Sequence, residues 1–204
     1  DHKHLISKDQ LCDGLIDCFD LSDECNENCK VKRILEHWFL KATCWIMGFF
    51  AIIFNVILLV QTALHFKSVE TGSLLQTKVL VAIISFGDLL NGVYLIILSV
   101  YDSFVFGDDY CKKQMEWLSG NTCALLGIIS TLGSQLSLFA MTALSLIRVI
   151  GLTFMSMTAP SSVNKRVIVR IIAMVTTIVA LSLSVALVPL APSLEDYFVQ
   201  GLYY

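Results

Sequence analysis

The sequence has few charged residues and few prolines, and it lacks the motifs of common soluble enzymes. Only 15% of its 204 residues are charged, whereas an ordinary soluble domain has roughly 25%. The net charge is −3 and no stripe of basic residues is present, which argues against nucleic acid as a partner. There is no glycine-rich phosphate loop, no zinc-type Cys-x-x-Cys pair and no arguable Ser/His/Asp constellation. We therefore expect no catalytic residues and no enzyme activity.

What the sequence does contain is long apolar runs, in a chain that is 56% hydrophobic. The four runs cover residues 42–64, 79–101, 118–147 and 171–194. Each is longer than the roughly 18 residues that mark a membrane span. A fully buried core helix would explain any single run, but four runs separated by short polar loops favour the membrane. We predict an all-α membrane protein, in contact with lipid, with helices near residues 38–65, 77–101, 118–150 and 167–190.

The distribution of Lys and Arg around the runs predicts which side faces the cytoplasm. The loops after the first and third runs carry five of these cations and one acid: Lys67, Lys78, Lys165, Arg166 and Arg170, against Glu70. The opposite side carries most of the acids, but also cations that oppose this orientation: Lys30, Lys32, Arg33, Lys41, Lys112 and Lys113. Disulfides in the N-terminal segment would outweigh those cations, because disulfides persist in oxidising compartments. We expect a multi-pass plasma-membrane protein with its N-terminus outside the cell.

Acidic residues alternate with cysteines in the segment CDGLIDCFDLSDEC, residues 12–25. Asp13, Asp17, Asp23 and Glu24 supply four carboxylates, and hard cations such as calcium bind roughly six to eight oxygen ligands. Crosslinks could hold together a segment that is too short to form its own core. A solvated acidic loop with incidental cysteines is the alternative explanation.

This segment resembles the C-terminal half of an LDL-receptor class A repeat, whose signature reads C-D-G-x-x-D-C-x-D-x-S-D-E-x-C. The resemblance implies a calcium site formed by the four acidic side chains and by the backbone carbonyls of Gln10 and Leu15. It also implies that Cys12 pairs with Cys25, and that Cys18 pairs with a cysteine upstream of residue 1. We accordingly expect a partial extracellular repeat, a juxtamembrane linker and a transmembrane domain at residues 1–28, 29–37 and 38–204.

Three polar side chains fall inside the apolar runs: Asn55, Asp88 and Ser137. Such residues are costly in a bilayer and face the interior of a bundle. For Asn55 and Ser137 alone, hydrogen bonding between helices is the preferred explanation. Asn91 follows Asp88 by three residues and lies on the same helix face. A carboxylate near the bilayer centre favours a functional role for Asp88.

The arrangement resembles the rhodopsin-like G-protein-coupled receptors. The residues that carry the resemblance are Asn55 in FNVILLV, Asp88 in the second run, the segment WLSGNTC at 117–123, and Arg148. The segments GVYLIILSVYD, EWLSGNTC and SQLSLFAMTALSLIR look most like the leucine-rich-repeat hormone receptors. Among these, the relaxin-receptor type and a related invertebrate receptor carry LDL-receptor class A repeats.

The resemblance implies that this chain is an incomplete fragment, holding the first four helices of a partial seven-helix receptor bundle. Such a receptor transmits the signal of an extracellular peptide or protein ligand to a heterotrimeric G protein. By position, Asp88 and Ser137 would line an interior sodium and water site, and Asn55 would help hold the first two helices together. The resemblance further implies that Arg148 lies at the cytoplasmic end of its helix and that Trp117 lies in an extracellular loop. It also implies that Cys123 forms a disulfide with a cysteine that this chain lacks.

One departure and two alternatives accompany this interpretation. Ile147 stands where the family has an acidic residue before Arg148, which predicts a weaker restraint on the inactive state. The main alternative is a four-span membrane adhesion or scaffold protein with an extracellular calcium-binding module. The other is a lipoprotein-type binding module that uses the membrane segment only as an anchor. Tetraspanins and claudins, which are four-span proteins of this kind, place both termini in the cytoplasm, whereas both are expected outside here.

Overall fold

The chain forms a bundle of long helices in the computed structural model, which describes residues 7, 35, 37–66, 71–106, 113, 117, 120–154 and 165–188. The four long helices are α1 (Trp38–Leu64), α2 (Gly72–Val100), α4 (Asn121–Phe154) and α5 (Lys165–Ala186). A π-helix, η3 (Tyr101–Phe106), continues α2. Each of the four is long and apolar enough to cross a membrane. The predicted all-α membrane architecture is confirmed.

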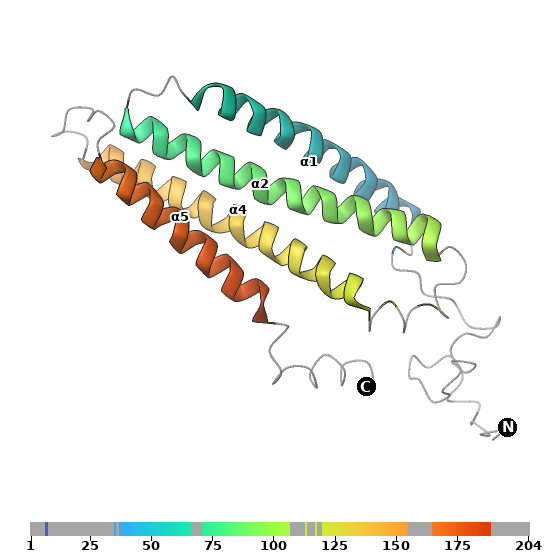
Figure 1. The fold of residues 1–204 in the computed structure, drawn as a ribbon. Helices are drawn as coiled ribbons and strands as arrows, with labels where there is room; N and C mark the ends of the chain where they lie inside the picture. Colours follow the sequence, from blue (N-terminus) through green and yellow to red (C-terminus); the bar gives the residue numbers. More distant parts are fainter. Residues whose placement is uncertain are drawn as a thin grey trace.

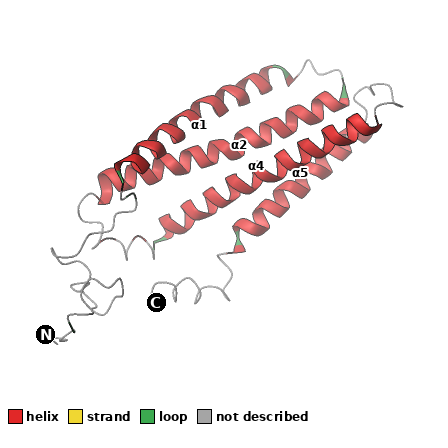
Figure 2. Ribbon diagram, turned by 180° about the vertical axis from the view of Figure 1, so that it is seen from behind, coloured by secondary structure: helices red, strands yellow, loops and turns green. Residues whose placement is uncertain are grey.

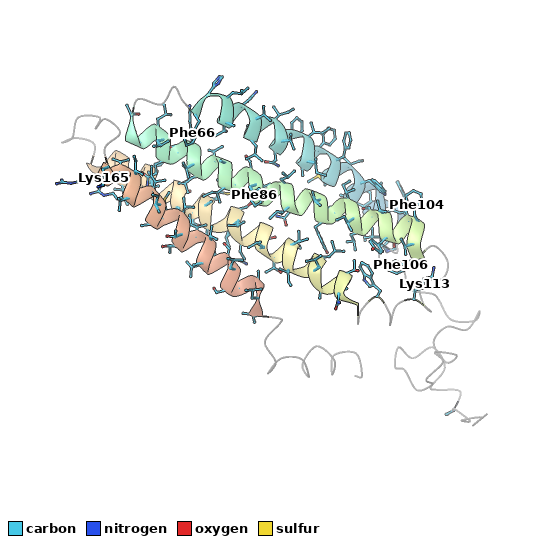
Figure 3. All side chains as sticks on the ribbon, in the orientation of Figure 1. Phe66, Phe86, Phe104, Phe106, Lys113 and Lys165 are labelled. Carbon is cyan, nitrogen blue, oxygen red and sulfur yellow. The ribbon has the colours of Figure 1, made fainter. Side chains whose placement is uncertain are left out.

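The helices lie side by side in the order α1, α2, α4, α5, and neighbours run antiparallel (Figures 1 and 2). The row is open, because α1 packs mainly on α2, and α5 packs mainly on α4. We call the two ends of the bundle the Trp38 end and the Lys165 end, after residues that lie there. The Trp38 end also holds η3, and the Lys165 end holds the start of α2. Figure 3 shows Phe104, Phe106 and Lys113 at the first end and Lys165 and Phe66 at the second.

The second helix begins earlier than predicted, and η3 extends the helical path beyond its predicted end. It begins at Gly72 rather than at residue 77, with Thr71 in an extended conformation before it and the Leu75 N–H bonded to the Thr71 carbonyl. Residues 72–78 are less apolar than the run that follows, so hydropathy alone misplaced this boundary. The helical path continues through η3 to Phe106 rather than ending at residue 101.

The last two helices also differ from their predicted ranges. The third predicted helix, α4, covers 121–154 instead of 118–150. The fourth, α5, begins at Lys165 instead of residue 167 and ends at Ala186 instead of residue 190. Pro189 explains the early end, because proline disfavours the helical conformation in the residue before it.

Close approach of helices is provided by glycine, and the remaining packing is apolar. A Cβ atom on Gly92 would lie 3.0 Å from the Cβ of Ala51 and 3.2 Å from the carbonyl oxygen of Gly48, so α1 and α2 meet at this pair. The buried core joins α2, α4 and α5 through Leu80, Leu136, Ala140 and Ile178. The outer side of α1 is largely exposed, as expected for a helix that faces lipid.

Candidate functional site

Asp88 and Ser137 come together at the crossing of α2 and α4. Ser137 donates a hydrogen bond from its hydroxyl to Asp88 Oδ1 at 2.7 Å. The same hydroxyl oxygen lies 3.2 Å from the carbonyl oxygen of Ile84, a longer contact that shares its single hydrogen. Ser137 is buried and Asp88 is half-buried. The structure therefore brings together the two residues that the sequence predicted in one interior site.

A second polar pair extends this site along the same two helices. The Ser134 hydroxyl donates to the Ser130 carbonyl at 2.8 Å and lies 3.2 Å from Asn91 Oδ1. Asn91 is one turn beyond Asp88, and Ser134 is one turn before Ser137. We call Asp88, Asn91, Ser134 and Ser137 the polar layer. Ser134 was not singled out from the sequence, because α4 carries several serines whose hydroxyls bond only their own helix.

Two glycines allow the backbones of α2 and α4 to approach at the polar layer. A Cβ atom added to Gly87 would lie 2.5 Å from Ser137 Oγ and 2.6 Å from the Gly133 carbonyl oxygen. A Cβ atom added to Gly133 would lie 2.7 Å from the Gly87 carbonyl oxygen. Small residues are what permit such an approach between membrane helices. Both glycines are therefore part of the site, although sequence reasoning had not included them.

The polar layer has donor atoms of the kind that bind a hard cation. It offers one carboxylate, two hydroxyls and one amide oxygen, and hard cations prefer oxygen ligands. A single negative charge suits a monovalent ion such as sodium better than a divalent one. Within the described ranges, no cluster of three or more His, Cys, Asp and Glu side chains could hold a metal.

Other residues predicted from the sequence lie apart from the polar layer. The Asn55 amide donates to the Ala51 carbonyl of its own helix at 2.9 Å, so its role in joining the first two helices stays a prediction. Arg148 is exposed near the end of α4, and the preceding Ile147 packs against the apolar core. Cys123, in the first turn of α4, is a free thiol. The roles expected for Arg148 and Cys123 also stay predictions.

Trp117 belongs to an aromatic cluster at the Trp38 end of the bundle. Its ring centroid lies 4.6 Å from that of Tyr101 and 5.2 Å from that of Phe106, with the Phe106 ring edge-on. The Lys113 ammonium donates to the Val105 carbonyl at 2.9 Å. These five residues border a cavity of about 410 Å³. The cluster packs Trp117 against η3, at the end of the bundle opposite Arg148.

An ion pair that sequence reasoning missed lies at the same end. Asp102 in η3 has a side chain only 2% exposed, and its Oδ2 lies 3.2 Å from the ammonium of Lys41 in α1. Its Oδ1 accepts the backbone N–H of Leu35 at 3.2 Å. The only sequence signal was the opposite charge of two residues at adjoining ends of the first two runs.

The predicted calcium and disulfide residues of the N-terminal segment lie outside the described residues. These are Gln10, Cys12, Asp13, Leu15, Asp17, Cys18, Asp23, Glu24 and Cys25.

Comparison with known proteins identifies related receptors. No family model matches the chain. It is 26% identical over 123 residues to the G-protein coupled receptor GRL101 of Lymnaea stagnalis, a match that covers 60% of this chain and 10% of the relative. It is 29% identical over 118 residues to the lutropin-choriogonadotropic hormone receptor of Sus scrofa, covering 57% and 16%. It is 27% identical over 138 residues to the thyrotropin receptor of Mus musculus, covering 67% and 17%.

The first of these relatives is named as a G-protein coupled receptor, and the other two are named as receptors for lutropin-choriogonadotropic hormone and thyrotropin. The chain is therefore similar to receptors, and its four membrane-type helices agree with that similarity. The matched regions represent between 10% and 17% of the length of these three relatives.

Proposed function

We propose that this chain supplies the first four spans of a hormone-type G-protein-coupled receptor. The receptor would be of the relaxin-receptor-like kind, passing the signal of an extracellular peptide or protein ligand to a heterotrimeric G protein. The main observation behind the proposal is the polar layer, which lies in the middle of two apolar helices. In it the Ser137 hydroxyl donates a hydrogen bond of 2.7 Å to the Asp88 carboxylate. The similarity to hormone receptors supports the same function.

The exposure of Asp88 supports the view that further helices belong to the bundle. The row of four helices leaves this residue partly exposed at mid-span. Ionisable groups at such depth face a bundle interior or a water-filled cavity rather than lipid. We propose that the remaining spans of a seven-helix receptor cover this face. A closed four-span adhesion protein would have to leave the same carboxylate against hydrocarbon.

The coding sequence downstream of this chain tests the receptor proposal. We expect three more apolar spans, with an Asn-Pro-x-x-Tyr motif in the last. The protein that includes them should stimulate nucleotide exchange on a G protein when it is reconstituted in membranes with a candidate peptide hormone. A downstream sequence without further spans would refute this proposal and leave the four-span scaffold alternative.

The charges at the two ends of the bundle support an orientation with the Lys165 end in the cytoplasm. The described cations at that end are Lys78, Arg148, Lys165, Arg166 and Arg170. Both described acids, Asp88 and Asp102, lie elsewhere. An epitope tag placed before residue 1 should be labelled by antibody on intact cells. Labelling only after permeabilisation would contradict the orientation.

We propose sodium as the ion of the polar layer, with Asp88 as the charged ligand. Sodium chloride should raise the thermal unfolding midpoint of the purified chain above that in N-methylglucamine chloride at equal ionic strength, because binding to the native state stabilises it. Asp88→Asn should abolish the difference, whereas Ser145→Ala should preserve it, because Ser145 bonds only its own helix. A difference that survives Asp88→Asn would exclude this site without affecting the receptor proposal.

We also propose that the N-terminal segment binds calcium as a partial LDL-receptor class A repeat. Side chains of Asp13, Asp17, Asp23 and Glu24 would act with the carbonyls of Gln10 and Leu15. Isothermal titration of the chain with calcium should give a binding signal that Asp17→Asn removes. Mass spectrometry without reduction should find Cys12 linked to Cys25. No calcium signal in a chain with that disulfide intact would refute the site.

A further inference from the structure

Asp102 occupies an unusual position at the Trp38 end of the bundle. One oxygen of its buried carboxylate accepts the backbone N–H of Leu35, which is 67 residues away in the sequence and lies in the linker before α1. The other oxygen pairs with the ammonium of Lys41, in the first turn of α1, at 3.2 Å. The Asp102 side chain thus contacts both the linker and the first helix. Its own backbone belongs to η3, which continues α2.

Stability alone is a poor explanation for this carboxylate. The ion pair at Oδ2 lacks the geometry of a hydrogen bond, and the neighbouring Ser103 hydroxyl is also buried without a partner among the described residues. The Lys41 side chain is 33% exposed, and ion pairs that water can reach typically add little to stability. Buried polar atoms of this kind call for a specific role.

The backbone around Asp102 also departs from regular structure. Asp102 lies in η3, where the α-helix of α2 gives way to a π-helix. Such π-helical segments occur frequently at functional sites. The contact to the linker therefore falls in the π-helical segment that follows α2.

We propose that Asp102 is a clamp that couples the extracellular linker to the end of α2. Its Oδ1 accepts the Leu35 N–H of the linker, and its Oδ2 pairs with Lys41 in the first turn of α1. Displacement of the linker would then alter the conformation of η3, and a change in η3 would alter the linker at Leu35, because coupling between two sites is reciprocal. The inference rests on the proposed function only in placing this end outside the cell.

The clamp is tested by hydrogen exchange, at single-amide resolution, on the purified 204-residue chain in lipid nanodiscs. Asp102→Leu removes the acceptor and should speed exchange of the Leu35 amide by about tenfold or more, as expected for losing a hydrogen bond to a charged group. Asp102→Asn keeps an acceptor oxygen and should retain most of the protection. Lys41→Met leaves the Leu35 bond in place and should also retain it. Equal exchange of the Leu35 amide in the native chain and in Asp102→Leu would overturn the clamp.

The reverse direction is tested at the linker. Leu35→Pro removes the N–H donor, since proline has none, and keeps both side chains of the ion pair. We expect faster exchange of the η3 amides, residues 101–106, by about threefold or more, if the lost bond is charge-assisted. Leu35→Ala is the matched control, because it keeps the N–H and changes only the side chain. Unchanged exchange in η3 with Leu35→Pro, or an equal increase with Leu35→Ala, would refute the coupling.

The test remains decisive if the leucine variant is unstable. Should Asp102→Leu lose its helical circular dichroism, the comparison of Leu35→Pro with Leu35→Ala still measures the coupling. These results are independent of signalling, so their failure would leave the receptor proposal intact. A failure of the receptor proposal would likewise leave the exchange results standing.

Discussion

Replacing Gly133 by alanine is expected to force α2 and α4 apart at the polar layer. The added methyl carbon would lie 2.7 Å from the backbone oxygen of Gly87, whereas ordinary contact begins at 3.4 Å. A backbone oxygen cannot rotate away, so the two helices must separate by roughly 0.7 Å at this point. That separation also stretches the 2.7 Å hydrogen bond between Ser137 and Asp88.

The magnitude follows from two opposing terms. Overpacking of a close contact costs about 1–3 kcal/mol, and alanine in place of glycine returns up to about 1 kcal/mol of helix propensity. We therefore expect Gly133→Ala to lower the free energy of unfolding by about 1–2 kcal/mol. The measurement is reversible unfolding of the chain in mixed micelles of increasing dodecyl sulfate content, followed by helical circular dichroism.

Gly127 provides the control on the same helix. Nothing lies within 4 Å of a Cβ atom added there. Gly127→Ala should therefore leave stability unchanged or raise it by up to about 1 kcal/mol. If Gly133→Ala proves as stable as Gly127→Ala, then the glycine crossing does not set the distance between α2 and α4, and the reasoning fails.

Three further predictions use the same unfolding measurement. Ser137→Ala should cost about 0.5–2 kcal/mol, because it leaves the Asp88 carboxylate without its hydroxyl donor, and a neutral result would show that the bond adds nothing. Gly72→Ala should cost about 1 kcal/mol through a 2.8 Å contact with Val167 Cγ1, and Val167→Ala should restore that loss in the double variant, since a side chain, unlike a backbone oxygen, can be removed. The loss of unfolding free energy in the double variant Gly87→Ala/Ser137→Ala should be smaller than the sum of the two single losses by about 0.5 kcal/mol or more, because removing the hydroxyl relieves a 2.5 Å contact. The control is Gly72→Ala combined with Ser137→Ala, for which the two losses should add.

The helices were predictable from the sequence because length and hydropathy are properties of each segment alone. The ends of the helices were harder to predict. The start of α2 at Gly72 precedes the apolar run, and the π-helical continuation to Phe106 has no signature in residue order. The end of α5 at Ala186 reflects Pro189, which is present in the sequence but was not used when the helix was predicted to reach residue 190.

The site was predictable in part. Asp88 and Ser137 could be named because a polar residue in an apolar run is conspicuous, and a family resemblance paired them. Gly127 and Gly133 lie on the same helix, yet only the second meets another backbone. Which glycine lies at a crossing depends on helix rotation and register, and neither can be read from one segment. Asp102 was missed for a related reason, since its partners Leu35 and Lys41 lie more than sixty residues away.

The glycine crossing and the polar layer are best understood as one structural unit. Lipid provides no hydrophobic driving force for the association of membrane helices, so close packing and hydrogen bonds must drive it. The serine hydroxyl is a single carbon from its backbone, and it can reach the Asp88 carboxylate only where the helices approach as closely as Gly87 and Gly133 allow. At the α4–α5 contact, by contrast, Ala140 and Ile178 pack in the apolar core. The carboxylate that could bind an ion and the glycines that position it therefore depend on each other, and a substitution at either should be detected at both.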